Sequence, residues 1–335
     1  MTRGVPGLDQ PVARVVVQRR GALPGSTLIV VGGIHGNEPT GLAMAGSLLA
    51  GLPVHAVHGE VVVLAGNRRA LAAGRRHLGR DLNRMWTTEQ LAEARAALGS
   101  RTPGAGDAPD AGDAPDASDA GDARALAIPE LAELVELADA IDAAIARARG
   151  PVYLLDLHTT SAPGFPFAVV GSSEAQRAFA RAFPMPGIVG FELSLSGTLT
   201  SHYGRRGCLA LAIEGGEHGT RTAADNLAAV LEIALEAAGC APRLPRAAGE
   251  DARDHLIQAR GDLPAVIELA LRHAVRPEHG FRMEPGFANL QRTASGTLLA
   301  RDASGEIRAP FDGVLVLPLY QPDGDDGFFY GRAAT

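Results

Sequence analysis

A histidine and a carboxylate stand three residues apart in the segment Gly32-Gly-Ile-His-Gly-Asn-Glu-Pro39. Imidazole nitrogen and carboxylate oxygen are suitable zinc ligands, and a catalytic zinc site typically has three protein ligands and one position left for water. His35 and Glu38 therefore need a third ligand. His158 is the candidate, because it ends another apolar run. The structural alternative is that His35 and Glu38 only cap a helix and that His158 is a polar strand end.

A further carboxylate, Glu214, follows the apolar run Leu209-Ala-Leu-Ala-Ile213 and precedes Gly215 and Gly216. A carboxylate at a strand end beside a metal can act as the base that takes a proton from water. The two glycines, which lack side chains, would let a substrate or the metal approach the backbone. A solvent-facing position at the strand end is the alternative interpretation of Glu214.

The segment Gly74-Arg-Arg-His-Leu-Gly-Arg-Asp-Leu-Asn-Arg84 is unusually basic for a chain of which 21% of the residues are charged. Arginine side chains suit carboxylate recognition and the stabilisation of a developing oxyanion. A solvated loop would equally explain Arg75 and Arg80. The residues Asp81-Leu-Asn-Arg84 could also form only a turn, because Asp and Asn readily bond to neighbouring backbone groups.

The elements that must position these residues alternate between strand and helix patterns. We expect strands at 26–32, 60–65, 152–157, 167–170 and 209–213, and helices at 40–52, 128–149 and 223–238. This alternation predicts an α/β fold with a mainly parallel or mixed sheet flanked by helices, in which ligand sites gather at the carboxyl ends of strands. His35, Glu38 and His158 would then lie at one edge of the sheet.

The pattern of apolar runs and turn-forming residues divides the chain into three parts. We expect a catalytic domain at 1–245, a connecting segment at 246–276 with a helix around 264–274, and a small β-rich domain at 277–335, where short apolar runs alternate with Gly, Pro and Asp. Within the first part, residues 105–122 form six triplets with six aspartates and no large apolar side chain. Such a segment cannot bury a core, so we expect a solvated insertion.

Composition excludes several classes of protein. With 335 residues, 46% of them hydrophobic, the chain can bury a sizeable core, which excludes a disordered or fibrous protein. The net charge of -7 and the lack of a basic stretch resembling a nucleic-acid footprint argue against nucleic acid as a partner. The sequence contains no run of about 18 consecutive apolar residues, which a membrane span would require. The only cysteines, Cys208 and Cys240, fit a reducing compartment, and the cytoplasm is expected.

Motifs of other enzyme classes are absent from the sequence. There is no Gly-x-Ser-x-Gly elbow, no phosphate-binding Gly-x-x-x-x-Gly-Lys-Ser/Thr loop and no Gly-x-Gly-x-x-Gly after the first predicted strand. Serine-hydrolase, nucleotide-hydrolase and dinucleotide-binding interpretations therefore lose their main support. The remaining eight histidines, His218 among them, fit no ligand spacing and are expected to be surface or structural residues. An oligomer is possible, but no sequence feature indicates one.

Four segments together resemble the succinylglutamate desuccinylase and aspartoacylase family, zinc enzymes similar to the carboxypeptidase A type of metallopeptidase. Gly-Gly-Ile-His-Gly-Asn-Glu, Arg-Asp-Leu-Asn-Arg, Asp-Leu-His-Thr-Thr and Ile-Glu-Gly-Gly occur in the family's order, and a small C-terminal β-domain also matches. The resemblance covers nearly the whole chain. It implies one Zn²⁺ per chain, held by His35, Glu38 and His158, with Glu214 as the general base.

The resemblance also implies roles for residues whose local pattern left them open. Asn83 and Arg84 would bind a substrate carboxylate, and Arg76 would polarise the scissile carbonyl. Asp156 would orient the site without binding the metal itself, by contacting a metal ligand. Tyr320 is the candidate for a substrate-contacting tyrosine of the C-terminal domain.

These observations lead to one leading function and two alternatives. We expect a cytoplasmic zinc-dependent hydrolase that cleaves an amide bond of a small-molecule, carboxylate-bearing substrate, with N-acyl amino acid deacylation as the implied reaction. The alternatives are a metallocarboxypeptidase acting on short peptides and a non-catalytic zinc-binding protein. Glu214 favours an enzyme over the latter, because a binding protein needs no proton acceptor beside its metal. The Asp-rich repeat and the segment at 215–219 depart from the family's pattern.

Overall fold

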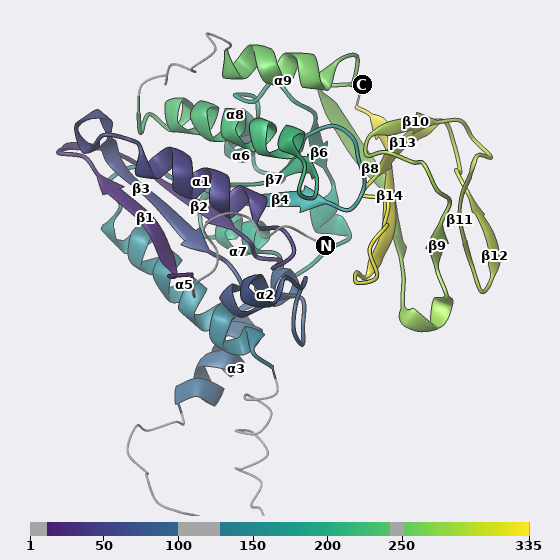
Figure 1. Ribbon diagram of the computed structural model, residues 1–335, viewed down its shortest axis with the longest axis horizontal. Coiled ribbons are helices and arrows are strands. Elements are labelled where there is room, and N and C mark those ends of the chain that lie inside the picture. Colours follow the sequence, from purple (N-terminus) through teal and green to yellow (C-terminus); the bar gives the residue numbers. More distant parts are fainter. Residues whose placement is uncertain (1–11, 100–127, 242–250, 335) are drawn as a thin grey trace, which may run out of the picture.

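A mixed sheet with helices on both faces organises the molecule (Figure 1). The computed structural model describes residues 12–99, 128–241 and 251–334. Within these residues, eleven strands form one sheet in the order β1-β3-β2-β4-β7-β5-β6-β8-β14-β13-β10. The α/β class expected from the sequence is confirmed.

The strands of this sheet are β1 (Val15–Arg20), β2 (Leu23–Gly32), β3 (His58–Ala65), β4 (Val152–Thr160), β5 (Phe167–Val170), β6 (Gly187–Val189), β7 (Leu209–Glu217), β8 (Val266–Ala274), β10 (Gln291–Thr293), β13 (Gly313–Val316) and β14 (Asp326–Ala333). A smaller sheet consists of β9 (Arg282–Met283), β11 (Leu298–Asp302) and β12 (Gly305–Arg308).

The α-helices are α1 (Thr40–Ala50), α2 (Arg68–Ala73), α3 (Thr88–Gly99), α5 (Glu130–Arg147), α6 (Glu174–Ala180), α7 (Leu199–Arg205), α8 (Arg221–Ala237) and α9 (Ala252–Arg260). Short 3₁₀ turns are η1 (Val54–Ala56), η2 (Leu82–Arg84), η3 (Phe191–Leu193) and η4 (Pro277–His279). Among the residues so described, no helix is both long enough and apolar enough to cross a membrane.

The second half of strand β2, residues 28–31, is apolar at every position because both of its faces are covered. Leu28 and Val30 belong to the core that α1 and α8 cover, whereas Ile29 and Val31 belong to the core beneath α5 on the other face. Successive side chains of a strand point to opposite faces, so a strand covered on both sides must be apolar at every position. Figure 1 shows α1 and α8 on one side of the sheet and α5 on the other.

Parallel pairing brings the chemically interesting strand ends together. The strands β3, β2, β4 and β7 are neighbours and run parallel, while β1 and β5 are antiparallel to the strands they flank. Gly32 at the end of β2 is the register partner of Leu157 in β4. The loop after β2 therefore begins beside His158, as expected from the sequence.

One sequence-based expectation is wrong. The segment expected to hold a helix around 264–274 forms the strand β8 instead, and the helix of this region is α9, which begins earlier. The strand pairs antiparallel with β14 and parallel with β6, and Ile267 is buried against Phe329. Long-range pairing with strands distant in the sequence overrides the local helical preference here.

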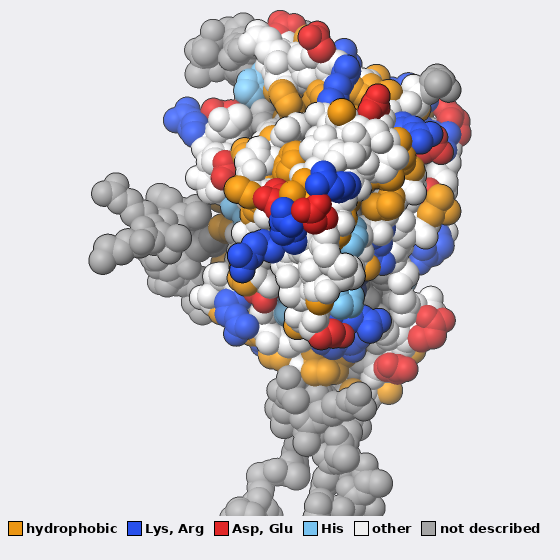
Figure 2. All heavy atoms as spheres, turned by 90° about the vertical axis from the view of Figure 1, so that its right-hand side faces the viewer, with side chains coloured by type: hydrophobic (Ala, Val, Ile, Leu, Met, Phe, Trp, Pro, Cys, Tyr) orange, Lys and Arg blue, Asp and Glu red, His pale blue; other side chains and the backbone are white. Residues whose placement is uncertain are grey.

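The strand β8 also links the two parts of the chain. Through β8 the main sheet continues into β14, β13 and β10, so the C-terminal strands extend the sheet that carries the predicted site. Figure 2 views the face on the C-terminal side and shows acidic and basic side chains intermixed over it. Ion pairs such as that of Arg301 with Glu284 (2.9 Å) occur in this part. The Asp-rich segment 105–122 lies outside the described residues.

Candidate active site

A tight loop after β2 carries the first two predicted metal ligands. Gly33 has a φ of +72°, a left-handed conformation that favours glycine. A Cβ added at Gly36 would lie 2.0 Å from the backbone carbon of Ala70 in α2. The glycines of this motif therefore allow the loop to fold closely against α2, and the loop presents His35 and Glu38 at the carboxyl edge of the sheet.

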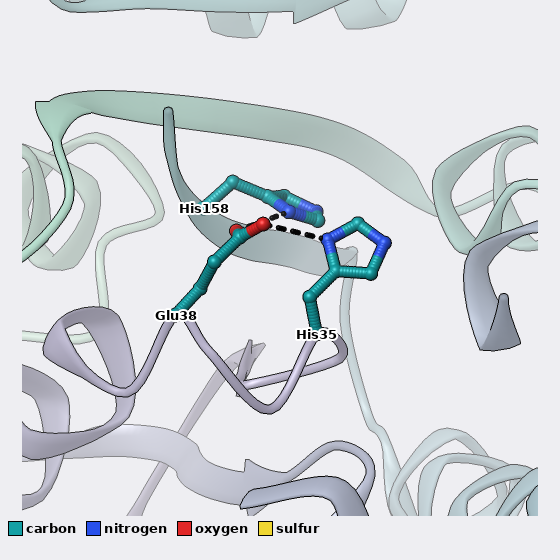
Figure 3. Close-up of side chains that lie close together, drawn as sticks. All are labelled: His35, Glu38 and His158. Atoms are coloured by element: carbon teal, nitrogen blue, oxygen red, sulfur yellow. Dashed lines mark hydrogen bonds and ion pairs between the residues drawn. The ribbon is translucent and has the colours of Figure 1, made fainter. Parts of the chain in front are cut away.

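The structure brings His35, Glu38 and His158 together (Figure 3). One potential ligand atom from each residue lies within 4.8 Å of the others, and all three side chains are buried. Figure 3 shows both imidazole rings directed toward the Glu38 carboxylate. The three residues form a compact group of two nitrogen donors and one carboxylate, a donor set that suits zinc.

Glu38 is held between the two rings. Its Oε1 lies 2.9 Å from Nδ1 of His35, and its Oε2 lies 3.0 Å from Nδ1 of His158. The backbone N–H of Thr159 donates to Oε2 at 3.1 Å. Burial alone would raise the pKa of Glu38, but the neighbouring imidazoles outweigh it and hold this pKa well below its usual range.

A carboxylate lies behind each imidazole. Asp81 Oδ1 is 3.1 Å from Nε2 of His35, and Asp156 Oδ2 is 2.9 Å from Nε2 of His158. Burial alone would lower the pKa of His158, but Asp156 and Glu38 hold it well above its usual value. A carboxylate on one ring nitrogen fixes the imidazole so that the other nitrogen faces the ligand position, which is the usual support of a metal-binding histidine. The residues therefore fit a metal ion.

Asp81 is a candidate site residue that sequence reasoning did not single out. The sequence pattern assigned Asp81 itself no role beyond a possible turn, and Asp81 does accept a hydrogen bond from the backbone N–H of Asn83 at 2.8 Å. The same Oδ1 also faces His35, and Oδ2 accepts from Arg76 at 2.8 Å. The available signal was the position of this aspartate in the Arg-Asp-Leu-Asn-Arg motif.

Glu214 lies on β7, and its register partner on β4 is His158. The side chain lines the same cavity as the His–Glu–His group, and its buried Oε2 has no hydrogen-bond partner within the described part of the chain. Burial raises the pKa of Glu214 to about 8, with Glu38 and Asp156 adding to the rise and His158 and Arg76 opposing it. Such a carboxyl is a stronger base than an exposed one.

The expected role of Gly215 is wrong. A Cβ added there would lie 2.5 Å from the side chain of Leu227 in α8. Because side chains alternate along a strand, Gly215 faces the helix when Glu214 faces the cavity. The missing side chain permits close packing of α8 on β7 and does not open a path for substrate.

The arginines of the basic segment differ in their surroundings. Arg76 is largely buried, where its Nη1 donates to Glu38 Oε1 at 3.4 Å and its Nη2 to Asp81 at 2.8 Å. Arg75 and Arg80 are exposed, as their alternative interpretation as loop residues expected. Only Arg76 of these three lines the cavity.

Asn83 and Arg84 line the cavity but also have structural partners. Asn83 Oδ1 accepts from the backbone N–H of Leu199, at the start of α7, at 2.9 Å. Arg84 Nη2 donates to Asp326 at 2.9 Å, and Arg272 donates to the other oxygen of the same carboxylate at 2.5 Å. Asp326 thus joins the basic segment to the C-terminal part of the sheet.

The cavity around these residues has a volume of about 470 Å³, within the usual range for small-molecule sites. Away from the His–Glu–His group its wall is largely uncharged and includes Val169, Phe191, Leu195, Ala210 and Ala212. Ala210 and Ala212 lie on the same face of β7 as Glu214, because every second residue of a strand points the same way. The cavity therefore continues along the sheet from the charged end.

Tyr320 does not line this cavity. Its hydroxyl donates to the carbonyl of Glu284 at 2.7 Å and accepts from the backbone N–H of Phe287 at 3.0 Å, both in the C-terminal part. The neighbouring residue Gln321 lines the cavity in its place. Sequence reasoning did not identify Gln321, and no sequence signal marks it.

Comparison with known proteins gives a family match for part of the chain. Residues 24–102 match the model of the Succinylglutamate desuccinylase/Aspartoacylase catalytic domain, a range that contains His35, Glu38, Arg76 and the Asn83-Arg84 pair. The resemblance inferred from the four sequence motifs is confirmed.

Several solved structures share the fold. The product-bound ectoine utilization protein EutE (DoeB) from Ruegeria pomeroyi is 18% identical, with a TM-score of 0.61 over 93% of this chain and 87% of that chain. The succinylglutamate desuccinylase from Vibrio parahaemolyticus is 14% identical, with a TM-score of 0.63 over 98% and 94% of the two chains. A succinylglutamate desuccinylase/aspartoacylase from Rhodobacter sphaeroides is 19% identical, with a TM-score of 0.59 over 95% and 88%. At these identities the likeness shows a common fold.

Proposed function

We propose that this chain, whose residues 24–102 match the succinylglutamate desuccinylase/aspartoacylase catalytic domain, is a zinc-dependent hydrolase of that family that deacylates a small N-acyl amino acid. The observation that carries the proposal is the His–Glu–His group, in which each imidazole is backed by a carboxylate, together with Glu214 on the adjacent strand. This combination of metal ligands, supporting carboxylates and an additional buried base is more than a metal-binding scaffold requires.

His35, Glu38 and His158 would hold one zinc ion per chain. When bound, zinc supplies a Lewis acid that polarises a carbonyl and lowers the pKa of water toward about 7. Asp81 and Asp156 support the two histidine ligands from behind. Their negative charge also makes the imidazoles better donors to a cation.

Glu214 is the proposed general base. In the ionised form its carboxylate takes a proton from the attacking water, and it delivers this proton to the amide nitrogen as the C–N bond breaks, so that a neutral amine leaves. Burial, which raises its pKa to about 8, increases the basicity of the carboxylate. The unpartnered Oε2 leaves a lone pair directed to no other residue of the described chain.

The arginines would recognise the negative charges of the reaction. Arg76, which contacts Glu38, would stabilise the charge that develops on the acyl oxygen. Asn83 and Arg84, which also line the cavity, would bind the substrate carboxylate. Arg84 is already paired with Asp326, so we propose that it contributes the donors that this ion pair leaves free.

A metallocarboxypeptidase remains the second candidate function. The same arginines would hold the C-terminal carboxylate of a short peptide, and the charged end of the cavity does not distinguish the two classes of substrate. As part of the same proposal the protein acts in the cytoplasm, since Cys208 and Cys240 are free and buried.

The test combines metal analysis with a hydrolysis screen. Zinc is measured in the purified protein, and the zinc-loaded protein is offered N-acetyl and N-succinyl amino acids beside dipeptides of the same residues. We expect about one zinc per chain and a higher kcat/KM for an N-acyl amino acid. Preference for dipeptides would establish the carboxypeptidase, and bound zinc without turnover of either class would establish a non-catalytic protein.

A further inference from the structure

A chain of hydrogen bonds ties Gln321 to both segments that carry the proposed metal ligands. Asn37, which precedes Glu38, donates from Nδ2 to Gln321 Oε1 at 3.0 Å. On the other side, His218 Nε2 lies 3.4 Å from the same oxygen, and His218 Nδ1 lies 2.8 Å from Thr159 Oγ1. Thr159 in turn donates its N–H to Glu38. The side chain of Gln321 is therefore held in place by its carbonyl oxygen.

The direction of these hydrogen bonds follows from the donors available. In the structure the Asn37 amide nitrogen faces Gln321, and the Gln321 oxygen accepts a hydrogen bond from it. When the Thr159 hydroxyl donates to Nδ1 of His218, Nε2 of that ring carries the proton and donates to Gln321 as well. Two donors then occupy the Gln321 oxygen, and the orientation of the amide is set.

This orientation leaves the amide nitrogen of Gln321 for the cavity. Gln321 is one of the residues that line the cavity around His35, Glu38 and Glu214. Within the described ranges its Nε2 donates no hydrogen bond to another residue, although it carries two N–H groups. A fixed donor pair beside the proposed metal site is suited to an acceptor oxygen on a ligand.

We propose that Gln321 determines specificity by donating a hydrogen bond from its NH₂ group to a carboxylate or carbonyl oxygen of the substrate. The inference rests on the proposed function and identifies what the C-terminal part contributes to the site. The part of the substrate beside Gln321 bears an acceptor oxygen and not an ammonium group, since an ammonium has no lone pair to accept. Tyr320, the tyrosine to which the family resemblance pointed, has its hydroxyl bonded within the C-terminal part.

Two substitutions separate the donor from the rest of the side chain. Gln321→Glu keeps an oxygen for Asn37 and His218 but replaces the NH₂ group with a second acceptor that carries negative charge. Gln321→Met keeps the length of the side chain and removes both polar groups without adding charge. The control is Tyr320→Phe, at the adjacent position, which removes a hydroxyl that does not face the cavity.

Binding and turnover are measured on zinc-loaded full-length protein. The ligands are the N-acyl amino acid with the highest kcat/KM and its two products, the carboxylic acid and the amino acid, with Kd from calorimetry. We expect Gln321→Met to raise KM and the Kd of one product about 10-fold, and Gln321→Glu to raise them about 100-fold. Zinc content, melting temperature and kcat should stay close to those of the wild type. The product that is affected identifies the substrate oxygen.

The outcomes are distinct. Unchanged KM and product Kd in both Gln321 variants, with an active wild type, would overturn the inference and leave the proposed function standing. The same holds if Tyr320→Phe reproduces the loss. A fall in zinc content in Gln321→Met and Gln321→Glu would also overturn it, because Gln321 would then act on the metal ligands. A wild type that is inactive on every substrate and binds neither product would remove both proposals together.

Discussion

His158 and Glu214 are register partners on the adjacent parallel strands β4 and β7. Register partners in a parallel sheet point to the same face, and neighbouring strands are about 4.8 Å apart. The proposed metal ligand and the proposed base are thus positioned by backbone hydrogen bonds of the central sheet and not by a loop. A rigid sheet is a suitable support for residues whose relative position matters for proton transfer.

Replacement of His158 should empty the metal site. In His158→Ala we expect zinc to fall from about one per chain to below about 0.1, because two ligands hold zinc far less tightly than three. Metal content of dialysed protein measured by mass spectrometry checks this. His55→Ala is the control, since His55 is exposed and lies outside the cavity. Full occupancy in His158→Ala would mean that the third ligand is another residue.

Asp81→Asn should weaken zinc binding without removing a ligand. Asp81 accepts from His35 and Arg76, and loss of its charge removes the support of the His35 ring. We expect zinc affinity to fall about 10- to 100-fold. Competition with a chelator of known affinity measures the change. Asp323→Asn is the control, because Asp323 is exposed and does not line the cavity. An unchanged affinity in Asp81→Asn would contradict a supporting role.

Glu214→Gln should separate the base from the metal ligands. The amide keeps the shape of the side chain but cannot accept the proton, so we expect kcat to fall at least about 100-fold with zinc still bound. Steady-state kinetics and metal analysis on the same preparation check both parts. Glu217→Gln, at the exposed end of β7, should keep normal turnover. Near-normal turnover in Glu214→Gln would exclude this proton transfer.

The raised pKa of Glu214 predicts a pH dependence of stability in the zinc-free protein. Burial raises this pKa from 4.5 to about 8, so the folded state favours the protonated form. The stabilisation is complete below about pH 4.5 and is lost as the pH rises through 8. Glu214→Gln is neutral at every pH and lacks this loss. Its free energy of unfolding, relative to wild type, should therefore increase by at least about 1 kcal/mol between pH 5 and pH 8.5.

Urea unfolding in the presence of a chelator measures this difference at several pH values. Taking the difference between the two proteins cancels the titration of groups that both contain. Glu217→Gln, at the exposed end of β7, serves again as the control. A constant difference for Glu214→Gln would show that Glu214 is ionised in the folded protein throughout this range.

Local patterns were sufficient for the elements buried on both faces. The strands β2, β4 and β7 each contain an apolar run, because helices cover both sides of this part of the sheet, and each was predicted within a few residues of its observed bounds. The helices α1, α5 and α8 were likewise predicted. The polar residues that interrupt or end these apolar runs were the signal for His158 and Glu214.

Elements that depend on distant partners were not predictable in this way. The local pattern of the β8 segment indicated a helix. Its pairing with β14 joins residues far apart in the sequence, so no local pattern could reveal that it is a strand. Asp81 was considered only as a turn residue because its contact with His35 spans 46 positions. Gln321 lies 284 positions from Asn37, and no local pattern could connect them.

The sequence by itself determined the class of the fold, most of the alternation of strands and helices, and the identity of the candidate metal ligands and of the basic side chains near them. These depend on burial and periodicity, which are properties of neighbouring residues. Only the tertiary structure decided which carboxylate supports which histidine, that Asp326 shares its charge between Arg84 and Arg272, and that Gln321 rather than Tyr320 lines the cavity. Each of these relationships is a contact between segments distant along the chain, and such contacts exist only after the sheet has brought those segments together.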